Sequence, residues 1–141
     1  MLHRSRYMRL LVPALALVAL LAVTGTSAGA GTFHFKEGTF VGKSGLDGGR
    51  IELEMKRKTR GLFIRHIVVK GSFDCYGYPE EVDIDRYSTG YKVGRRGGFR
   101  IPDADVSLRG HYVTSGRIEG SLVAKTFSCD SPQEHFGARR R

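Results

Sequence analysis

Apolar and polar residues alternate with a period of two through most of the chain after residue 32. In one segment Ile51, Leu53 and Met55 alternate with charged residues, and Ile118 and Leu122 belong to a second such segment. Successive side chains of a strand point to opposite faces, so this period predicts strands that are buried on one face. The segment 62–69 is richer in apolar residues and predicts a central strand covered on both faces.

Glycine-rich turns separate these segments, at residues 45–49, 59–61, 95–98 and 114–116. No stretch of ten or more residues after residue 30 has the apolar spacing of a helix. We therefore predict an all-β fold: an antiparallel β-sandwich, or a flattened barrel, of about seven to eight short strands.

The tetrapeptide Gly-Arg-Ile-Glu occurs twice, at residues 49–52 and 116–119. Each copy follows a glycine turn and an aromatic-Val strand, and the two turns differ in length. A hairpin strand with Ile inward and Arg and Glu in solvent needs this pattern. We interpret the repeat as two similar hairpins rather than as a duplicated site.

The N-terminal region has the three parts of a secretory signal peptide. A basic start precedes the apolar run Leu10–Val23, and Ala28-Gly29-Ala30 matches the pattern that signal peptidase recognises. The run is short for a membrane span, which needs about 20 residues, although a retained anchor stays open as the alternative. We predict a signal peptide at 1–30 with cleavage after Ala30, a secreted single domain at 31–138 and a basic C-terminal tail at 139–141.

The net charge of the exported part is smaller than that of the whole chain. The formal charge of +9 falls to +6 when the three arginines of the leader are removed, and three of those remaining charges are Arg139, Arg140 and Arg141. The predicted domain is therefore only mildly basic, which weakens the inference of an anionic partner from net charge alone.

The two cysteines, Cys75 and Cys129, both lie in the exported part. An even number of cysteines in an oxidising compartment predicts a disulfide. No Cys-x-x-Cys spacing or nearby histidine cluster points to a redox or metal-binding pair instead.

Spaced glycines and the two cysteines carry a family resemblance over residues 33–138. The shared positions are Gly38, Phe40, Gly42, Lys43 and Ser44; Arg50, Ile51 and Leu53; Cys75; Gly116, Ile118, Gly120 and Leu122; Cys129, Asp130 and Ser131; Phe136 and Ala138. The pattern resembles small secreted β-sandwich domains of unknown function that are common in actinobacteria and other high-GC bacteria. Phe136 stands where members usually carry Trp. The resemblance implies the fold and the disulfide, and it transfers no catalytic residue.

Searches for catalytic and metal-binding patterns identify no complete site. The pairs Asp83/Asp85 and Asp103/Asp105 lack the glycine and glutamate of a helix-flanked calcium loop. No pair among His34, His66, His111 and His135 has the short spacing of a local zinc site, and no nucleophile motif is present. We predict no enzymatic activity, no cofactor and no metal. The alternative is a small secreted metal-dependent hydrolase whose ligands assemble across strands.

Two groups of residues are candidates for binding surfaces, and both are also explained by ordinary solvated turns and cross-strand pairs. Basic residues in two turns predict an anionic-ligand surface, and tyrosines near acidic residues predict an aromatic surface for sugars. The predicted partners are an anionic cell-envelope polymer or carbohydrate, with no specific nucleic acid, for a monomer that touches the membrane only through its uncleaved leader. We therefore predict an extracellular or envelope-associated binding or structural module. The basic residues are Lys56, Arg57, Lys58, Arg60, Arg95 and Arg96, and the tyrosines are Tyr76, Tyr78, Tyr87 and Tyr91.

Overall fold

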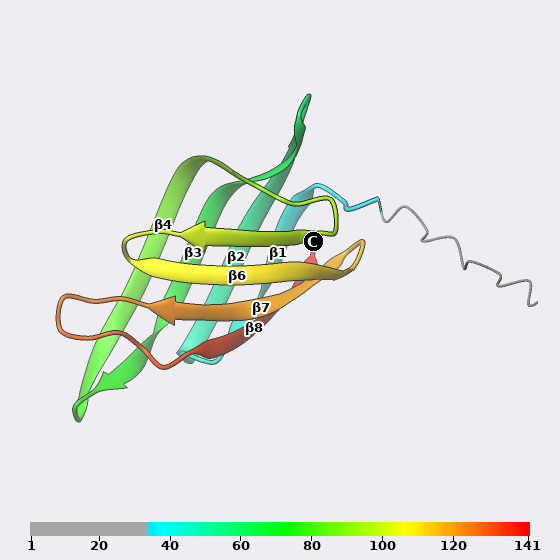
Figure 1. The fold of residues 1–141 in the computed structure, drawn as a ribbon. Coiled ribbons are helices and arrows are strands. Elements are labelled where there is room, and N and C mark those ends of the chain that lie inside the picture. Colours follow the sequence, from blue (N-terminus) through cyan, green and yellow to red (C-terminus); the bar gives the residue numbers. More distant parts are fainter. Residues whose placement is uncertain (1–33) are drawn as a thin grey trace, which may run out of the picture. The chain divides into compact units, whose positions relative to one another are not determined.

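The computed structural model describes residues 34–141, which form eight antiparallel strands (Figure 1). The predicted signal peptide lies outside the described residues, whereas the all-β antiparallel prediction is confirmed. In chain order the strands are β1 Gly38–Ser44, β2 Asp47–Lys58, β3 Gly61–Cys75, β4 Tyr78–Lys92, β5 Gly98–Pro102, β6 Val106–Thr114, β7 Arg117–Ala124 and β8 Glu134–Arg140.

All eight strands belong to one sheet, in the order β4-β3-β2-β1-β8-β7-β6-β5. Two meanders, β1 to β4 and β5 to β8, meet where the first strand pairs with the last. Figure 1 shows β5 to β8 crossing in front of β1 to β4, so the sheet curls into a half-barrel. A sandwich of two separate sheets is not confirmed, because the β1–β8 ladder makes the two layers continuous.

The strands of the first meander are longer than predicted. β3 and β4 each contain 15 residues, where the sequence predicted short strands. The ladders are irregular near Arg65: the β2–β3 register shifts between Glu54 and Met55, and the β3–β4 register shifts between Ile64 and His66. Such bulges bend a strand and increase its twist, so long strands can follow the curl of the sheet without ending.

The concave side of the sheet holds the hydrophobic core. Phe40, Ile51, Leu53, Leu108 and Ile118 are completely buried there. Burial of one such aliphatic side chain stabilises the fold by about 1.5–3 kcal/mol. The alternation that predicted the strands therefore also identified the core face correctly.

The two Gly-Arg-Ile-Glu copies lie on strands β2 and β7, each within a hairpin as predicted. In both copies the isoleucine is buried, and the arginine pairs with the glutamate two residues later, as Arg50 does with Glu52. A tandem duplication of four strands would place the second copy on β6 instead of β7. The repeat therefore reflects two hairpins with the same local structure and not a duplicated unit.

The C-terminal strand extends further than predicted. Arg139 and Arg140 were predicted to be a basic tail, but they belong to β8 and pair with Val41 and Phe40 of β1. Strand β8 is hydrogen-bonded to β1 on one side and to β7 on the other, and this pairing outweighs the tendency of a charged terminus to fray.

Candidate functional site

The two basic turns lie at the same end of the sheet. The chain reaches this end after β2, runs away along β3, returns along β4 and turns again before β5. We call it the basic end; it holds the turns 59–60 and 93–97 and the end of β8. The number of strands between the turns decides this placement, and the sequence had left it open.

A groove of about 480 Å³ opens between the two turns. Four of its lining residues are cationic, namely Arg57, Arg60, Lys92 and Arg95. Three of these were predicted, whereas Lys92 was missed. Lys92 could have been included from the sequence, because it is the last residue of the strand that precedes the second turn. The remaining lining residues are His34, Phe35, Gly61, Leu62, Val93 and Gly94.

The residues 34–37 form a strap across the basic end. Arg57 Nη2 donates to the Phe35 carbonyl at 2.6 Å, and the Arg57 amide donates to Glu37 Oε2 at 2.8 Å. Arg140 Nε donates to the Glu37 carbonyl at 2.8 Å. Arg57 and Arg140 therefore hold the strap in place, so they contribute less freely to binding than the other cations do.

Aromatic packing fixes the strap from beneath. The Phe35 ring lies 4.7 Å from the Tyr112 ring, and the Tyr112 hydroxyl donates to the Lys36 carbonyl at 2.8 Å. Burial raises the pKa of the Tyr112 phenol well above its ordinary value, against the opposing fields of Arg57 and Arg140. Gly97 has a φ of 81°, and a Cβ there would lie 2.7 Å from the Phe35 ring, so this position requires glycine.

Three lining cations have no ion-pair partner among residues 34–141, namely Arg60, Lys92 and Arg95. Their charges therefore face solvent uncompensated around one groove. Within about 8 Å, the Debye length at physiological salt, such charges act together on a ligand.

The other predicted basic residues lie outside the groove. Lys56 is adjacent to Arg57 on β2 and so points to the opposite face of the sheet. Lys58 places its ammonium 5.4 Å from the ring centroid of Phe63. Arg96 is exposed beside Arg95 in the turn. These three residues add positive field to the basic end without lining the groove.

The four predicted tyrosines do not form one surface. Tyr91 packs against the core, and Tyr87 stacks on the His66 ring at 4.1 Å. Tyr76 and Tyr78 are exposed at the opposite end of β4, and nine residues of strand from Tyr78 to Tyr87 span about 30 Å. Only Tyr76 and Tyr78 share a surface.

The acidic side chains considered for calcium contact basic side chains. Arg86 reaches from β4 to both Asp103 and Asp105 in the β5–β6 turn. Asp83 pairs with Lys70 at 3.0 Å, and Asp85 contacts His66 at 2.7 Å. Within residues 34–141, no three His, Cys, Asp or Glu side chains converge in an arrangement that could hold a metal ion.

A larger hollow, of about 650 Å³, lies on the convex face of β6, β7 and β8. Its polar side chains are Arg109, His111, Glu119, Ser121 and His135, a set of mixed charge. Glu119 is already paired with Arg117. Because these side chains are of mixed charge, the hollow offers no group of like charges toward a ligand.

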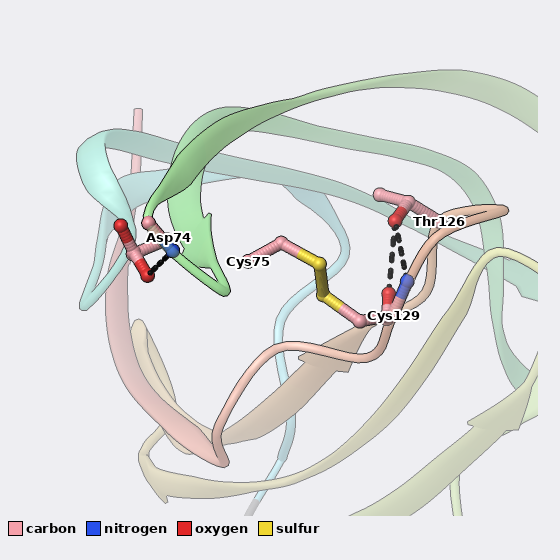
Figure 2. Close-up of a disulfide and its surroundings, with 5 residues drawn as sticks. Asp74, Cys75, Thr126 and Cys129 are labelled. Atoms are coloured by element: carbon pink, nitrogen blue, oxygen red, sulfur yellow. Dashed lines mark hydrogen bonds between the residues drawn. A yellow bond between two sulfur atoms is a disulfide. The ribbon is translucent and has the colours of Figure 1, made fainter.

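The disulfide prediction is confirmed. Cys75 and Cys129 are bonded, with their Cα atoms 6.3 Å apart (Figure 2). The bond joins the end of β3 to the β7–β8 loop, at the end of the sheet opposite the basic end. We call this the disulfide end.

No family model, curated protein or solved structure matches the chain. The resemblance to secreted actinobacterial domains therefore stays a prediction. In the part of the chain from 34 to 141, no helix has the length and hydrophobicity of a membrane span. The disulfide is compatible with an extracellular location.

Proposed function

We propose that this protein is a non-catalytic extracellular binding module whose basic end recognises an anionic polymer of the cell envelope. The observation that supports it best is the groove between the two basic turns, lined by the unpaired cations Arg60, Lys92 and Arg95. Cations that are distant in sequence meet here around a preformed groove.

The chemistry of the groove fits a polymer rather than a small ligand. It is an open groove, and the same end of the sheet carries further cations at Lys58, Arg96 and Arg141. A repeating anion can contact several of these charges at once and release counterions along its length. Backbone hydrogen bonds within the turn 93–97 also reduce the entropy that the site loses on binding.

A salt titration with matched variants tests the proposal. We would measure binding to immobilised polyphosphate for the wild type, for Arg60→Gln/Lys92→Gln/Arg95→Gln, and for Lys43→Gln/Arg100→Gln/Arg109→Gln. Both variants lose three positive charges, but only the first variant loses cations that line the groove. We expect the groove variant to bind about tenfold or more weakly and to reduce the slope of log K against log salt by about 2–3. The control variant should keep the wild-type slope.

Equal losses in the two variants would contradict the proposal, because they would show that net charge alone controls binding. Binding by neither the wild type nor the control would exclude polyphosphate-like polymers as partners of this end.

A further inference from the structure

Strand β4 leaves one edge of the sheet open. Among residues 34–141 it pairs only with β3, and β5 forms the other edge of the same sheet. Within the described part of the chain, no backbone–backbone hydrogen bond outside the β3 ladder involves residues 78–92, and the Gly90 amide donates to Ser88 Oγ of the same strand. An open strand edge offers a row of N–H and C=O groups on which another extended chain can pair.

A groove of about 350 Å³ runs along this edge. Seven consecutive residues, 80–86, line it. Because alternate residues of a strand point to opposite faces, a groove that contacts all seven must follow the edge and not a face. Seven residues of strand span about 20 Å, which is the length of an extended hexapeptide.

The facing wall of the groove is rigid. It consists of Asp105, Lys125 and Thr126. The Lys125 amide donates to the Asp105 carbonyl at 2.9 Å, and the Ala124 amide donates to the buried Ser131 Oγ at 2.9 Å. Arg86 adds a side-chain link from β4 to Asp105. The groove is therefore preformed.

Exposed aromatic side chains stand where this groove reaches the disulfide end. Tyr76 and Tyr78 are 87% and 74% exposed, and Phe127 is fully exposed. Figure 2 shows the disulfide linking the β3–β4 turn to the loop that carries Phe127. Thr126 Oγ1 bonds with the Cys129 backbone, and the Gly77 amide donates to Asp74 Oδ1 at 2.9 Å. Exposed aromatic side chains on two fixed turns are typical of a contact surface.

The charge of the groove selects its partner. Its carboxylates outnumber its cations. Asp83, Asp85 and Asp105 already contact Lys70, His66 and Arg86. Glu80 and Glu81 have no ion-pair partner among residues 34–141, so their charges are available to a cationic ligand. Carboxylates attract lysine and arginine side chains, and aromatic faces also bind these cations. The carboxylates are Glu80, Glu81, Asp83, Asp85 and Asp105.

A second copy of this chain does not match the groove. The acidic edge of one β4 repels the same edge of another, which is a usual protection against edge-to-edge pairing. The arginines Arg139 and Arg140 already lie in β8, which pairs with β1 and β7. Charge complementarity therefore favours a basic segment of another polypeptide over pairing of two β4 edges.

We propose that the open edge of β4 binds an extended, lysine- or arginine-rich peptide segment, which joins the sheet as an additional strand. Main-chain pairing supplies affinity, the carboxylates select basic residues, and Tyr76, Tyr78 and Phe127 contact the segment where it leaves the groove.

The test uses the untruncated protein and the acetylated, amidated hexapeptide Lys-Val-Lys-Thr-Lys-Val at low salt, measured by calorimetry. One control peptide carries an N-methyl group on every residue, which keeps its charge and removes the N–H donors from both edges, so that it cannot pair as a strand. A second control replaces each Lys with Glu. We expect the N-methylated peptide to bind at least tenfold more weakly and the Glu peptide to show no binding.

Two protein variants locate the site. Glu80→Gln/Glu81→Gln should weaken binding of the Lys peptide about fivefold, whereas Glu52→Gln/Glu54→Gln, with the same charge change on β2, should stay within twofold. Equal binding of the parent and N-methylated peptides would overturn the proposal in favour of charge attraction alone. Absence of Lys-peptide binding would also overturn it, as would concentration-dependent dimerisation that Glu80→Gln/Glu81→Gln abolishes, since a second copy would then be the occupant.

Discussion

The basic end and the disulfide end close the same curled sheet in different ways. At the basic end, the strap 34–37 is held by hydrogen bonds from Arg57, Arg140 and Tyr112. At the disulfide end, a covalent bond between Cys75 and Cys129 joins the two meanders. The basic end packs its aromatic rings, Phe35 and Tyr112, against each other and has no disulfide. The disulfide end exposes its aromatic side chains and is closed by a covalent bond.

The two ends also differ in charge. Successive turns of a meander lie at opposite ends of the sheet. Cations in one set of alternate turns and acids in the other set are therefore separated in space. The basic end collects cations, whereas the disulfide end collects the acids Asp47, Asp74, Glu80, Glu81, Asp103, Asp105, Asp130 and Glu134. A small net charge thus conceals two strongly charged poles.

The largest expected effect comes from removing the cross-link. Cys75→Ser/Cys129→Ser should lower the free energy of unfolding by about 4 kcal/mol, because the disulfide closes a loop of 54 residues in the unfolded chain. Urea unfolding followed by circular dichroism measures this. The groove variant Arg60→Gln/Lys92→Gln/Arg95→Gln should unfold near the wild-type midpoint. If the cysteine variant did so too, the disulfide end would not depend on its covalent bond.

An intermediate effect is expected at the strap, and it depends on pH. Tyr112→Phe loses the hydrogen bond to Lys36, which should cost about 1 kcal/mol near pH 8. Because the folded pKa of Tyr112 is raised, its stabilisation is complete below the unfolded pKa of about 10 and is lost as the pH rises above it. The stability difference between wild type and variant should therefore shrink between pH 9 and 11, by up to about 1.4 kcal/mol per unit above pH 10. A difference that stays constant over this range would contradict the buried neutral phenol.

The smallest effect is a gain in stability at the disulfide end. Tyr76 has a φ of 56°, which side chains other than glycine, asparagine and aspartate adopt at a cost. With Gly77 it forms the two-residue turn of the β3–β4 hairpin, and Asn-Gly is the preferred pair there. Tyr76→Asn should therefore raise the free energy of unfolding by about 0.5–1 kcal/mol while it weakens binding of the Lys hexapeptide. A loss of stability on thermal unfolding would show that the tyrosine is held by packing.

Local patterns predicted the strands and the core, but not how the sheet closes. Alternation at Ile51 and Ile118 reports which face of a strand is buried, and this is a local property. Whether β1 and β8 pair, and so join the two layers into one sheet, depends on residues almost 100 positions apart. The choice between a sandwich and a half-barrel could not be read from either segment alone.

The candidate sites show the same division. Arg57, Arg60 and Arg95 were recognised from composition, but their common groove follows from the number of strands between the turns. The edge position of β4 was not foreseen, because its acids and tyrosines resembled a solvated surface. The alternation of buried Val82 and Ile84 with exposed Asp83 and Asp85 was the available signal for this strand.

The pairing of β8 with β1 and β7 means that the last of the eight strands in chain order fills the centre of the sheet. Without residues 134–140 the two meanders have no ladder between them, so the domain cannot complete its core until this segment is available. Contacts of such large sequence separation also make folding slow, on the order of milliseconds to seconds. The cross-link between Cys75 and Cys129 joins the same two meanders, so it secures covalently the closure that β8 completes by strand pairing.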